Sequence, residues 1–330
     1  MTLQQSSMTP RASAPDLSIV TTLYRSAPYI KEFHGRISHV AADITSSYEM
    51  VFVNDGSPDP SVELAVSLAS SDPHVRVVDL SRNFGHHAAI MAGLRHSRGR
   101  RVFLIDIDLE EQPEWLGEFW EDMNARPADM VYGVQRARHG SSFNRLAGSL
   151  FYSLFNLASD IRIPRNVCTV RLMSRRYVDA VCELNEAHIF MAGLFSWAGF
   201  VQRPRYVSRR PRKSASNYTL GRSIRLFVNA ITSFSSYPLT LVFFAGLSIT
   251  VLSVLYALWL LISKLVRGEV VLSGFTSVMI SLWFLGGAIL CALGLIGLYV
   301  GRIFTETKSR PQYIVSRLYE PDEGVYKLND

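Results

Sequence analysis

The stretch FLIDIDLEEQPEWL, Phe103 to Leu116, joins the pattern of a buried strand to that of a helix start. Its apolar run ends at Asp106, and the acidic residues Asp108, Glu110 and Glu111 follow at once. Residues i and i+2 of a strand point to the same side, so Asp106 and Asp108 face one point if the strand persists through them. Such carboxylates are typical of a divalent metal site. A solvated, helix-capping turn would have the same composition, so both interpretations stay open at this point.

Strand patterns alternate with helix patterns from Leu17 onwards. The strand-like runs are LSIVTTL, EMVFVNDGS, VRVVDLS and RRVFLIDID, and helical stretches lie around residues 28–42 and in GHHAAIMAGLRHS. This spacing predicts an α/β fold with a mainly parallel, Rossmann-like sheet and helices on both faces. Ligands of such sheets bind beyond the carboxyl ends of the strands. Polar residues follow three of these ends and should form one site: Asp55, Ser81 to Asn83, Asp106 and Asp108.

Missing motifs narrow the range of functions. No Gly-x-Gly-x-x-Gly sequence follows the first strand, and no Walker lysine loop is present, which disfavours dinucleotide dehydrogenases and P-loop enzymes. The remaining interpretation is a nucleotide site at the strand ends, with a metal bound by carboxylates. Mg²⁺ or Mn²⁺ suits such hard oxygen ligands. The three cysteines, Cys168, Cys182 and Cys291, have no paired spacing, so disulfides and a zinc site are not expected.

Two long apolar segments follow the α/β pattern. Leu239 to Ser263 and Phe275 to Gly301 contain 25 and 27 residues without a charge, whereas about 20 apolar residues span a bilayer. The first 16 residues lack the apolar core of a secretory signal and have the composition of a disordered tail. Basic residues flank the pair of segments mainly on its outer sides. We therefore expect a multi-pass protein of the inner (cytoplasmic) membrane, with the α/β domain and both termini in the cytoplasm.

The region before the first apolar segment is basic. No acidic residue lies between Glu186 and Glu269, while eight arginines and lysines lie between Glu186 and the first segment. Each cation near an anionic membrane surface contributes about 1 kcal/mol of attraction. One interpretation is a loop, RRPRKSASNY, that closes over a lipid phosphate and a nucleotide diphosphate; the other is an ordinary positive-inside flank. Residues 219–237 have the spacing of an interfacial amphipathic helix, and the adjacent apolar segments argue against nucleic acid as a partner.

Several motifs together resemble family 2 glycosyltransferases with the GT-A fold. VNDGS, SRNFGHHAAIMAGL and IDIDLEEQPE carry the resemblance, and RLMSRRYVDAV, MAGLFSWAGF and ITSFSSYPL extend it over about Leu17 to Arg310. The chain is more narrowly similar to polyprenyl-phosphate glycosyltransferases of the dolichol-phosphate mannose synthase type, in their bacterial two-span form. This group includes a tetrameric branch, so the resemblance also implies a homo-oligomer.

The resemblance implies a role for each matching residue. The nucleotide would be bound by Thr22, Tyr24, Asp55, Asn83 and Asp106. The metal, Mg²⁺ or Mn²⁺, would be held by Asp106, Asp108 and Glu110, where relatives have Gln at the last position. The candidate catalytic residues are Asp108, Arg136 and Arg171. The lipid phosphate would be bound by Arg136, Arg145, Ser149, Arg212, Lys213 and Ser216.

Three positions depart from the family pattern. Arg25-Ser26 replaces Asn-Glu after the first strand, Thr169 replaces an Asp often proposed as catalytic base, and Asn217 replaces a lysine. The missing base does not exclude catalysis, because a phosphate acceptor with a second pKa near 6 is largely ionised at pH 7. The sequence also predicts that Glu111 belongs to the start of the next helix, which favours acids. For His86-His87 it predicts a capping or nucleotide role.

The expected organisation has five parts: a disordered tail (1–16), a GT-A domain (17–218), an interfacial helix (219–237), two spans (239–263 and 275–301, within 238–304) and a cytoplasmic tail (305–330). The expected function is transfer of one sugar from a nucleotide diphosphate sugar, a UDP-sugar, to undecaprenyl phosphate, with a bound metal and inversion. The alternative is a catalytically weak, nucleotide-sugar-binding membrane protein of the same fold. A processive polysaccharide synthase is disfavoured, because the chain lacks a Gln-x-x-Arg-Trp motif and further spans.

Overall fold

The computed structural model describes residues 14–135, 164, 166–186, 189–208, 237–267, 274–320 and 324–326. The chain divides into two compact units. The α/β unit comprises Met1–Leu150, Ile163–Asn217 and Pro311–Asp330, and the helical unit comprises Phe151–Arg162 and Tyr218–Arg310. The predicted disordered tail, apart from residues 14–16, and the predicted interfacial helix, apart from Tyr237, lie outside the described residues.

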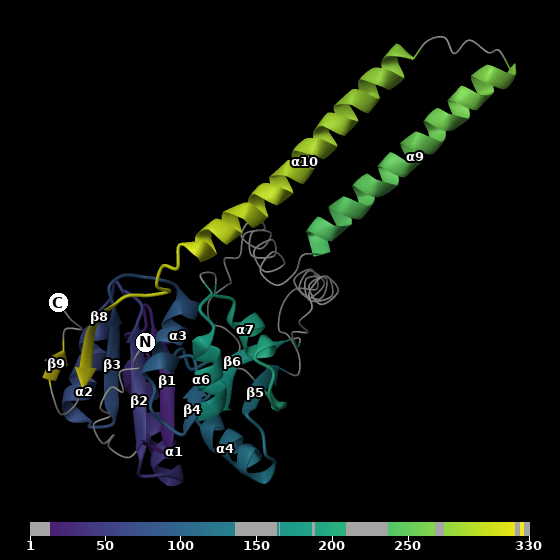
Figure 1. The fold of residues 1–330 in the computed structure, drawn as a ribbon. Helices are drawn as coiled ribbons and strands as arrows, with labels where there is room; N and C mark the ends of the chain where they lie inside the picture. Colours follow the sequence, from purple (N-terminus) through teal and green to yellow (C-terminus); the bar gives the residue numbers. More distant parts are fainter. Residues whose placement is uncertain are drawn as a thin grey trace, which may run out of the picture. The chain divides into compact units, whose positions relative to one another are not determined.

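One sheet organises the described part of the α/β unit (Figure 1). Its strands are β1 (Leu17–Leu23), β2 (Tyr48–Asn54), β3 (Val75–Leu80), β4 (Arg101–Leu104), β5 (Met130–Gln135), β6 (Val167–Ser174), β7 (Gln202–Val207), β8 (Val315–Glu320) and β9 (Gly324–Tyr326). They lie in the order β7-β5-β6-β4-β1-β2-β3-β8-β9. Apolar, β-branched residues dominate the central strands because those strands are buried on both faces.

The direction of each strand determines which strand ends lie at the same edge of the sheet. Strands β1 to β4 pair in parallel, β6 is antiparallel to β4 and β5, and β7 is parallel to β5. The carboxyl ends of β1 to β5 and β7 therefore lie at one edge, together with the amino end of β6. We call this the carboxyl edge. The prediction of a mainly parallel α/β sheet is confirmed.

Helices cover both faces of the sheet. One face carries α1 (Ile30–Ile44), α2 (Ser61–Ser71) and α4 (Trp115–Ala125), and the other carries α3 (His86–His96), α6 (Arg175–Glu183) and α7 (Met191–Trp197). Alternating strand residues separate the two cores: Ile19 packs with α1, α2 and α4, while Val20 packs with α3, α6 and α7. Both cores fix the strands, so the loops at the carboxyl edge project from a rigid base.

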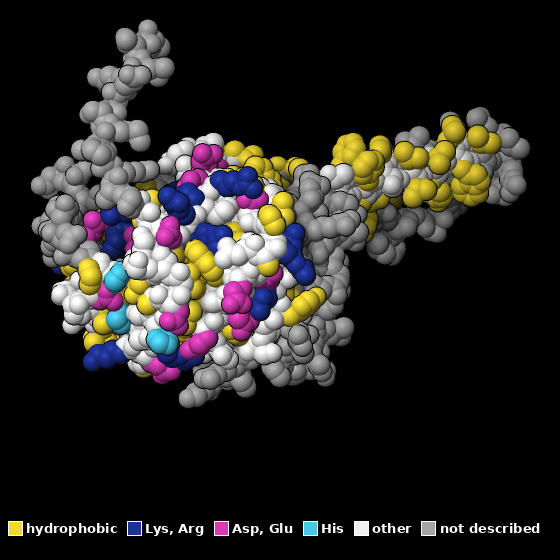
Figure 2. Space-filling view, turned by 90° about the horizontal axis from the view of Figure 1, so that it is seen from below, with side chains coloured by type: hydrophobic (Ala, Val, Ile, Leu, Met, Phe, Trp, Pro, Cys, Tyr) yellow, Lys and Arg dark blue, Asp and Glu magenta, His cyan; other side chains and the backbone are white. Residues whose placement is uncertain are grey.

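The helical unit contains α9 (Tyr237–Arg267) and α10 (Phe275–Thr307), which coincide with the two predicted apolar segments. Among the described residues, Phe284–Thr307 is long and apolar enough to cross a membrane, and a shorter apolar stretch covers Leu239–Ile249. Hydrophobic side chains dominate the described surface of these helices, whereas charged side chains are scattered over the α/β unit (Figure 2). Both segments are helices, as predicted, and one of them qualifies as a span.

The C-terminal region differs from the expected tail 305–330. Helix α10 continues to Thr307, and residues 315–320 form β8, which pairs antiparallel with β3. Leu80 lies opposite Val315, and Val77 lies opposite Tyr319. The sequence did not predict this strand, because it is short and half exposed, and because its partner β3 lies far earlier in the chain.

Candidate active site

Asp55, directly after β2, organises the loop that follows β3. Its Oδ1 accepts a hydrogen bond from the backbone N–H of Phe84 at 2.7 Å, and its Oδ2 accepts one from Gly85 at 3.0 Å. Asn83 Nδ2 donates back to the Asp55 carbonyl oxygen at 3.0 Å. Burial raises the pKa of Asp55, although these N–H groups oppose the shift. Asp55 and Asn83 thus shape the loop, and nucleotide contact by either remains a prediction.

Gly56 allows these two loops to approach each other. Its φ of +58° is left-handed, and a Cβ atom added there would lie 2.4 Å from the backbone nitrogen of Asn83. A backbone atom cannot move away as a flexible side chain can. The Asn-Asp-Gly-Ser sequence after β2 is therefore a requirement of loop packing as well as a turn signal.

His86, the first residue of α3, connects two strand ends. Its Nδ1 lies 3.1 Å from Thr22 Oγ1 at the end of β1, and its Nε2 lies 3.5 Å from Asp106 Oδ1. The neighbouring His87 lies 3.0 Å, through its own Nδ1, from the carbonyl oxygen of Ile189. Burial lowers the pKa of His87, which favours a neutral ring that donates to this carbonyl. Thr22 and Asp106 therefore lie together, as predicted, with His86 between them.

Residues 106–111, which we call the acidic loop, do not continue the strand. Strand β4 ends at Leu104, so the condition under which Asp106 and Asp108 were expected to face one point, a strand that persists through both, is not met. Ile105 and Ile107 nevertheless pack into the same core cluster, and Asp106 and Asp108 stay partly exposed. The turn is tight because Leu109, a non-glycine residue, has a left-handed φ of 59°. Asp108 Oδ1 accepts the backbone N–H of Glu110 at 3.0 Å, which orients its carboxylate.

Glu111 is not part of a solvated helix start. Helix α4 begins at Trp115, and the Glu111 side chain is fully buried. Its Oε1 accepts the backbone N–H of Thr169 at 3.0 Å, so it joins the acidic loop to the amino end of β6. Sequence periodicity missed this role because the partner is a backbone group supplied by a distant strand. The replacement of the family's Asp by Thr169 therefore leaves a carboxylate beside this position.

Arg171 is a buried cation near the carboxyl edge. Its Nε and one terminal nitrogen donate to the carbonyl oxygens of Thr169 and Cys168, both at 2.9 Å, and the guanidinium lies 3.8 Å from the Phe195 ring centroid. Burial lowers the pKa of Arg171 to about 10, against the fields of Tyr177, Glu111 and Asp106. Because that pKa stays above 7, the side chain holds its positive charge at neutral pH.

The segment after β1 carries the first departure from the family pattern. Tyr24 is 48% exposed, and Arg25 has a left-handed φ of 55°. The Arg25 backbone N–H donates to Ser57 Oγ at 2.7 Å, and Ser26 Oγ accepts the N–H of Tyr24 at 3.0 Å. Serine hydroxyls thus hold this turn. The exposed Tyr24 ring is free of the core, which is compatible with the predicted nucleotide contact.

A comparison with protein families decides the class. The family model described as Glycosyl transferase family 2 matches residues 18–182. The chain belongs to glycosyl transferase family 2. A Mycobacterium tuberculosis (strain CDC 1551 / Oshkosh) protein named as a glycosyltransferase is 42% identical, over 93% of this chain and 89% of that protein. The bactoprenol glucosyl transferase of Shigella phage SfX is 35% identical, over 91% of this chain and 98% of that protein.

Solved structures match this chain at low sequence identity. A glucosyl-3-phosphoglycerate synthase from Mycobacterium tuberculosis, in complex with Mn²⁺, UDP-glucose and phosphoglyceric acid, has a TM-score of 0.46 and 16% identity. The match covers 66% of this chain and 79% of that chain. A similarity of this size says nothing about the ligands of the present glycosyltransferase.

The acidic loop of this family 2 glycosyltransferase fits a hard divalent cation. The described residues contain no cluster of three or more histidine, cysteine or acidic side chains arranged around one metal position. Mg²⁺ typically takes only one or two protein carboxylates and completes its shell with water and phosphate oxygens. Asp106 and Asp108 are partly exposed at the carboxyl edge and supply that number, with Glu110 beside them. Metal binding by these three residues remains a prediction.

The predicted acceptor site of the glycosyltransferase cannot be placed. Its members, Arg136, Arg145, Ser149, Arg212, Lys213 and Ser216, lie outside the described residues, as does His188. The structure therefore brings together Thr22, Asp55, Asn83 and Asp106. Asp108 follows Asp106 by two residues, and Arg171 lies opposite Leu104, the last residue of β4. His86 and Glu111 are the site residues whose contacts the sequence did not reveal.

Proposed function

We propose that this glycosyltransferase transfers a single sugar from a nucleotide diphosphate sugar, a UDP-sugar, to a polyprenyl phosphate at the cytoplasmic face of the membrane. The acceptor class is supported by the bactoprenol glucosyl transferase of Shigella phage SfX, which is 35% identical over 91% of this chain. Undecaprenyl phosphate is the proposed bacterial acceptor, and the product would serve the cell envelope. Inversion at the anomeric carbon and assembly into a homo-oligomer are part of the proposal and rest on the family resemblance.

One structural observation carries the proposal. The carboxyl edge holds the acidic loop, which is the candidate donor site. Strand β7, the last described strand before α9, ends at this edge at Val207, and β8, the first described strand after α10, begins there opposite Leu80. The strands next to the apolar helices in sequence therefore end and begin at the edge of the proposed donor site.

Chain connectivity supports a two-span arrangement. Strand β8 follows α10 in sequence, yet it belongs to the same sheet as the strands that precede α9. This connectivity supports the proposal that both ends of the helical pair lie on one side of the membrane. In this proposal the apolar Phe284–Thr307 segment of α10 and helix α9 each cross the bilayer once. The proposed location is the inner membrane, with the α/β unit in the cytoplasm.

The proposed reaction needs charge compensation more than proton transfer. An oxygen of the acceptor phosphate attacks the anomeric carbon, the bond from that carbon to the diphosphate oxygen breaks, and the nucleoside diphosphate leaves with the bonding electrons. The acceptor phosphate has a second pKa near 6, so it is largely ionised at pH 7. A bound divalent cation supplies compensation for the charge that develops on the leaving diphosphate. Thr169 in place of an acid is compatible with this chemistry.

The residues of the carboxyl edge would hold the cation and stabilise negative charge. His86 orients Asp106, the N–H of Glu110 orients Asp108, and both carboxylates would hold the cation. Arg171 is a fixed positive charge in a dry environment, where electrostatic stabilisation is stronger than in water. Arg136 and the basic loop are proposed to hold the acceptor phosphate, because two anions must come together in this reaction.

The test uses the purified full-length protein in detergent. It is incubated with undecaprenyl phosphate, Mn²⁺ and a panel of radiolabelled nucleotide sugars, and lipid-extractable radioactivity is measured. We expect one donor to give a lipid-linked product whose formation stops when the cation is chelated. Measurable nucleotide binding without product from any donor would overturn the proposal and favour the alternative of a nucleotide-sugar-binding protein.

A further inference from the structure

The chain that returns from α10 reaches the α/β unit at the carboxyl edge. Strand β8 runs antiparallel to β3, so its first residue, Val315, lies opposite Leu80, the last residue of β3. The four residues before it, Pro311–Ile314, form what we call the return segment. These residues belong to the α/β unit, whereas Arg310 belongs to the helical unit. The return segment is therefore the described part of the chain that comes back to the carboxyl edge after α10.

The return segment contacts the loop after β3. The carbonyl oxygen of Ile314 accepts the backbone N–H of Ser81 at 2.9 Å. Ser81 begins the loop whose residues Phe84 and Gly85 donate to the carboxylate of Asp55. One wall of the proposed donor site is thus hydrogen-bonded to a residue that lies beyond both apolar helices in sequence.

Gln312 contacts a second loop, which precedes α7. Its Nε2 donates to the carbonyl oxygen of Glu186 at 2.9 Å and lies 3.5 Å from that of Leu184. Its Oε1 is buried and accepts no hydrogen bond from the described residues. Further along the chain, the carbonyl oxygen of Ile189 lies 3.0 Å from His87 Nδ1. Gln312 therefore contacts residues shortly before the one that lies against His87, the neighbour of His86.

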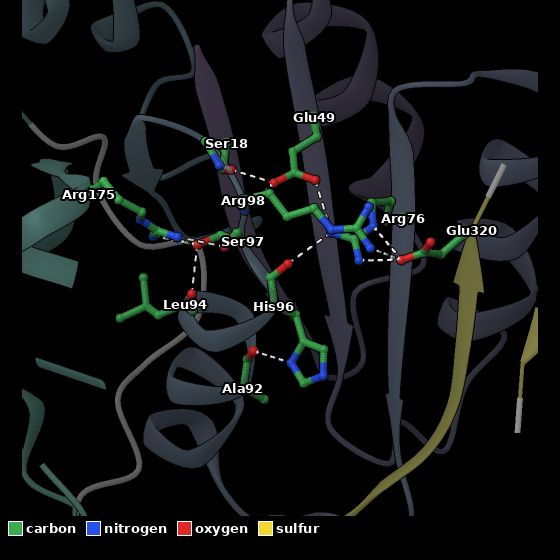
Figure 3. Close-up of polar contacts among 11 residues, drawn as sticks. Ser18, Glu49, Arg76, Ala92, Leu94, His96, Ser97, Arg98, Arg175 and Glu320 are labelled. Carbon is green, nitrogen blue, oxygen red and sulfur yellow. Dashed lines mark hydrogen bonds and ion pairs between the residues drawn. The ribbon is translucent and has the colours of Figure 1, made fainter. Parts of the chain in front are cut away.

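Two further contacts keep the return segment and β8 in place. The Arg95 guanidinium lies 5.8 Å from the Tyr313 ring centroid and donates to the carbonyl oxygen of Cys182 at 3.0 Å. At the far end of β8, Glu320 pairs with Arg76 and Arg98, and Arg76 also contacts Glu49 at 2.9 Å (Figure 3). Because Arg76 is nearly fully buried, loss of its carboxylate partners would leave an unpaired charge in the interior.

We propose that Gln312 is a positioning residue of the glycosyltransferase: it holds Leu184 and Glu186, so that the nearby Ile189 carbonyl oxygen stays against His87 and His86 keeps the donor site in its binding geometry. The inference rests on the proposed function for the identity of the donor site. Gln312 touches neither substrate nor metal in this scheme and acts through the loop. The segment that returns from the apolar helices thereby becomes part of the catalytic unit, because it completes a wall of the site as well as the sheet.

The experiment compares Gln312→Ala, Gln312→Lys and Ser316→Ala in the full-length protein. Lysine retains a donor that reaches the two carbonyl oxygens, and Ser316 is an exposed residue of β8, which makes its replacement the matched control. For Gln312→Ala we expect the KM for the nucleotide sugar to rise about two- to tenfold, the worth of one lost hydrogen bond, with a smaller change in kcat. Gln312→Lys should recover most of the loss, and Ser316→Ala should match the wild type.

Hydrogen–deuterium exchange without any substrate gives a second readout. Gln312→Ala should raise exchange at residues 184–186, which Gln312 contacts, and in the first turn of α3, while β1 and β2 stay protected. An unchanged KM together with unchanged exchange would overturn the inference, as would an equal loss in Ser316→Ala. If the wild type makes no product from any nucleotide sugar, the proposed function fails, and the exchange data still decide whether Gln312 holds the loop.

Discussion

The Nε2 atom of His86 lies 3.5 Å from Oδ1 of Asp106, while its Nδ1 lies 3.1 Å from Thr22 Oγ1. A half-exposed ring thus bridges the ends of β1 and β4. Imidazole can serve both partners at once, because one ring nitrogen donates while the other accepts. The carboxylate of Asp106, the first residue of the acidic loop, is therefore contacted by His86, the first residue of α3.

His86→Ala should lower kcat/KM about tenfold, since it removes the ring that lies between Thr22 Oγ1 and the Asp106 carboxylate. His86→Gln, which can still reach Asp106, should lose less. The measurement is the steady-state rate of lipid-linked product at several Mn²⁺ concentrations. His39→Ala is the control, because the His39 side chain is 83% exposed on α1. Equal rates for wild type and His86→Ala would contradict the bridging role.

Asp108→Asn should abolish metal-dependent turnover, because a neutral amide is a far weaker ligand for a hard cation than a carboxylate. Membrane insertion should be unaffected, since Asp108 lies far in sequence from α9 and α10. Activity is measured against Mn²⁺ concentration, and insertion by carbonate extraction of membranes. Asp43→Asn, at an exposed position of α1, is the matched control. Full activity of Asp108→Asn would refute the metal assignment.

Gly56→Ala should lower the free energy of unfolding by about 2–4 kcal/mol, from left-handed strain and the clash with the Asn83 backbone. Nucleotide binding should weaken as well, because the loop after β3 must move. Gly35→Ala is the control: a Cβ atom there meets no heavy atom within 4 Å, and alanine is the better helix former. Urea melts of the detergent-solubilised protein report both effects. If Gly56→Ala and Gly35→Ala have the same free energy of unfolding, the loops after β2 and β3 can move apart at little cost.

Glu111→Ala should destabilise the protein by about 1–3 kcal/mol, because the partly buried N–H of Thr169 loses its acceptor. Glu111→Gln should cost less, since its amide oxygen can still accept. A merely solvated acid would change stability by no more than about 0.5 kcal/mol, and Glu121→Ala, on the exposed face of α4, provides that comparison. If Glu111→Ala and Glu121→Ala have the same melting mid-point, the first interpretation of Glu111, a solvated acid at the helix start, would be correct.

Asp72 predicts a pH dependence of stability. Burial raises the pKa of Asp72, but hydrogen bonds from the backbone and side chain of His74 and from His34 outweigh it, and the net pKa is lowered. A depressed pKa adds stability that is fully present above the unfolded value, about 3.9, and is lost as the pH falls toward the folded value. Asp72→Asn should therefore destabilise the protein at pH 7, and this difference should shrink at pH 3. A constant difference in urea melts between these pH values would contradict the assignment.

Local patterns were sufficient for the fold class and for part of the site. The alternation of strand and helix patterns from Leu17 predicted the mainly parallel sheet, because a central strand and an amphipathic helix each leave a short-range signature. The same pattern placed Asp106 at a strand end, at one edge of the sheet with Asp55 and Asn83. It failed where contacts join distant segments: β4 stops at Leu104, and the buried Glu111 binds the backbone of β6.

The amino-acid sequence by itself determined the two apolar segments, the α/β pattern and the acidic residues after β4, since composition and short-range periodicity encode each of these. Only the tertiary structure decided that His86 bridges Thr22 and Asp106, that Glu111 is buried, and that the chain returns after α10 to add β8 to the sheet. The physical reason is that a buried hydrogen bond or a strand pairing depends on two segments, and the energy of each appears only when both are in place.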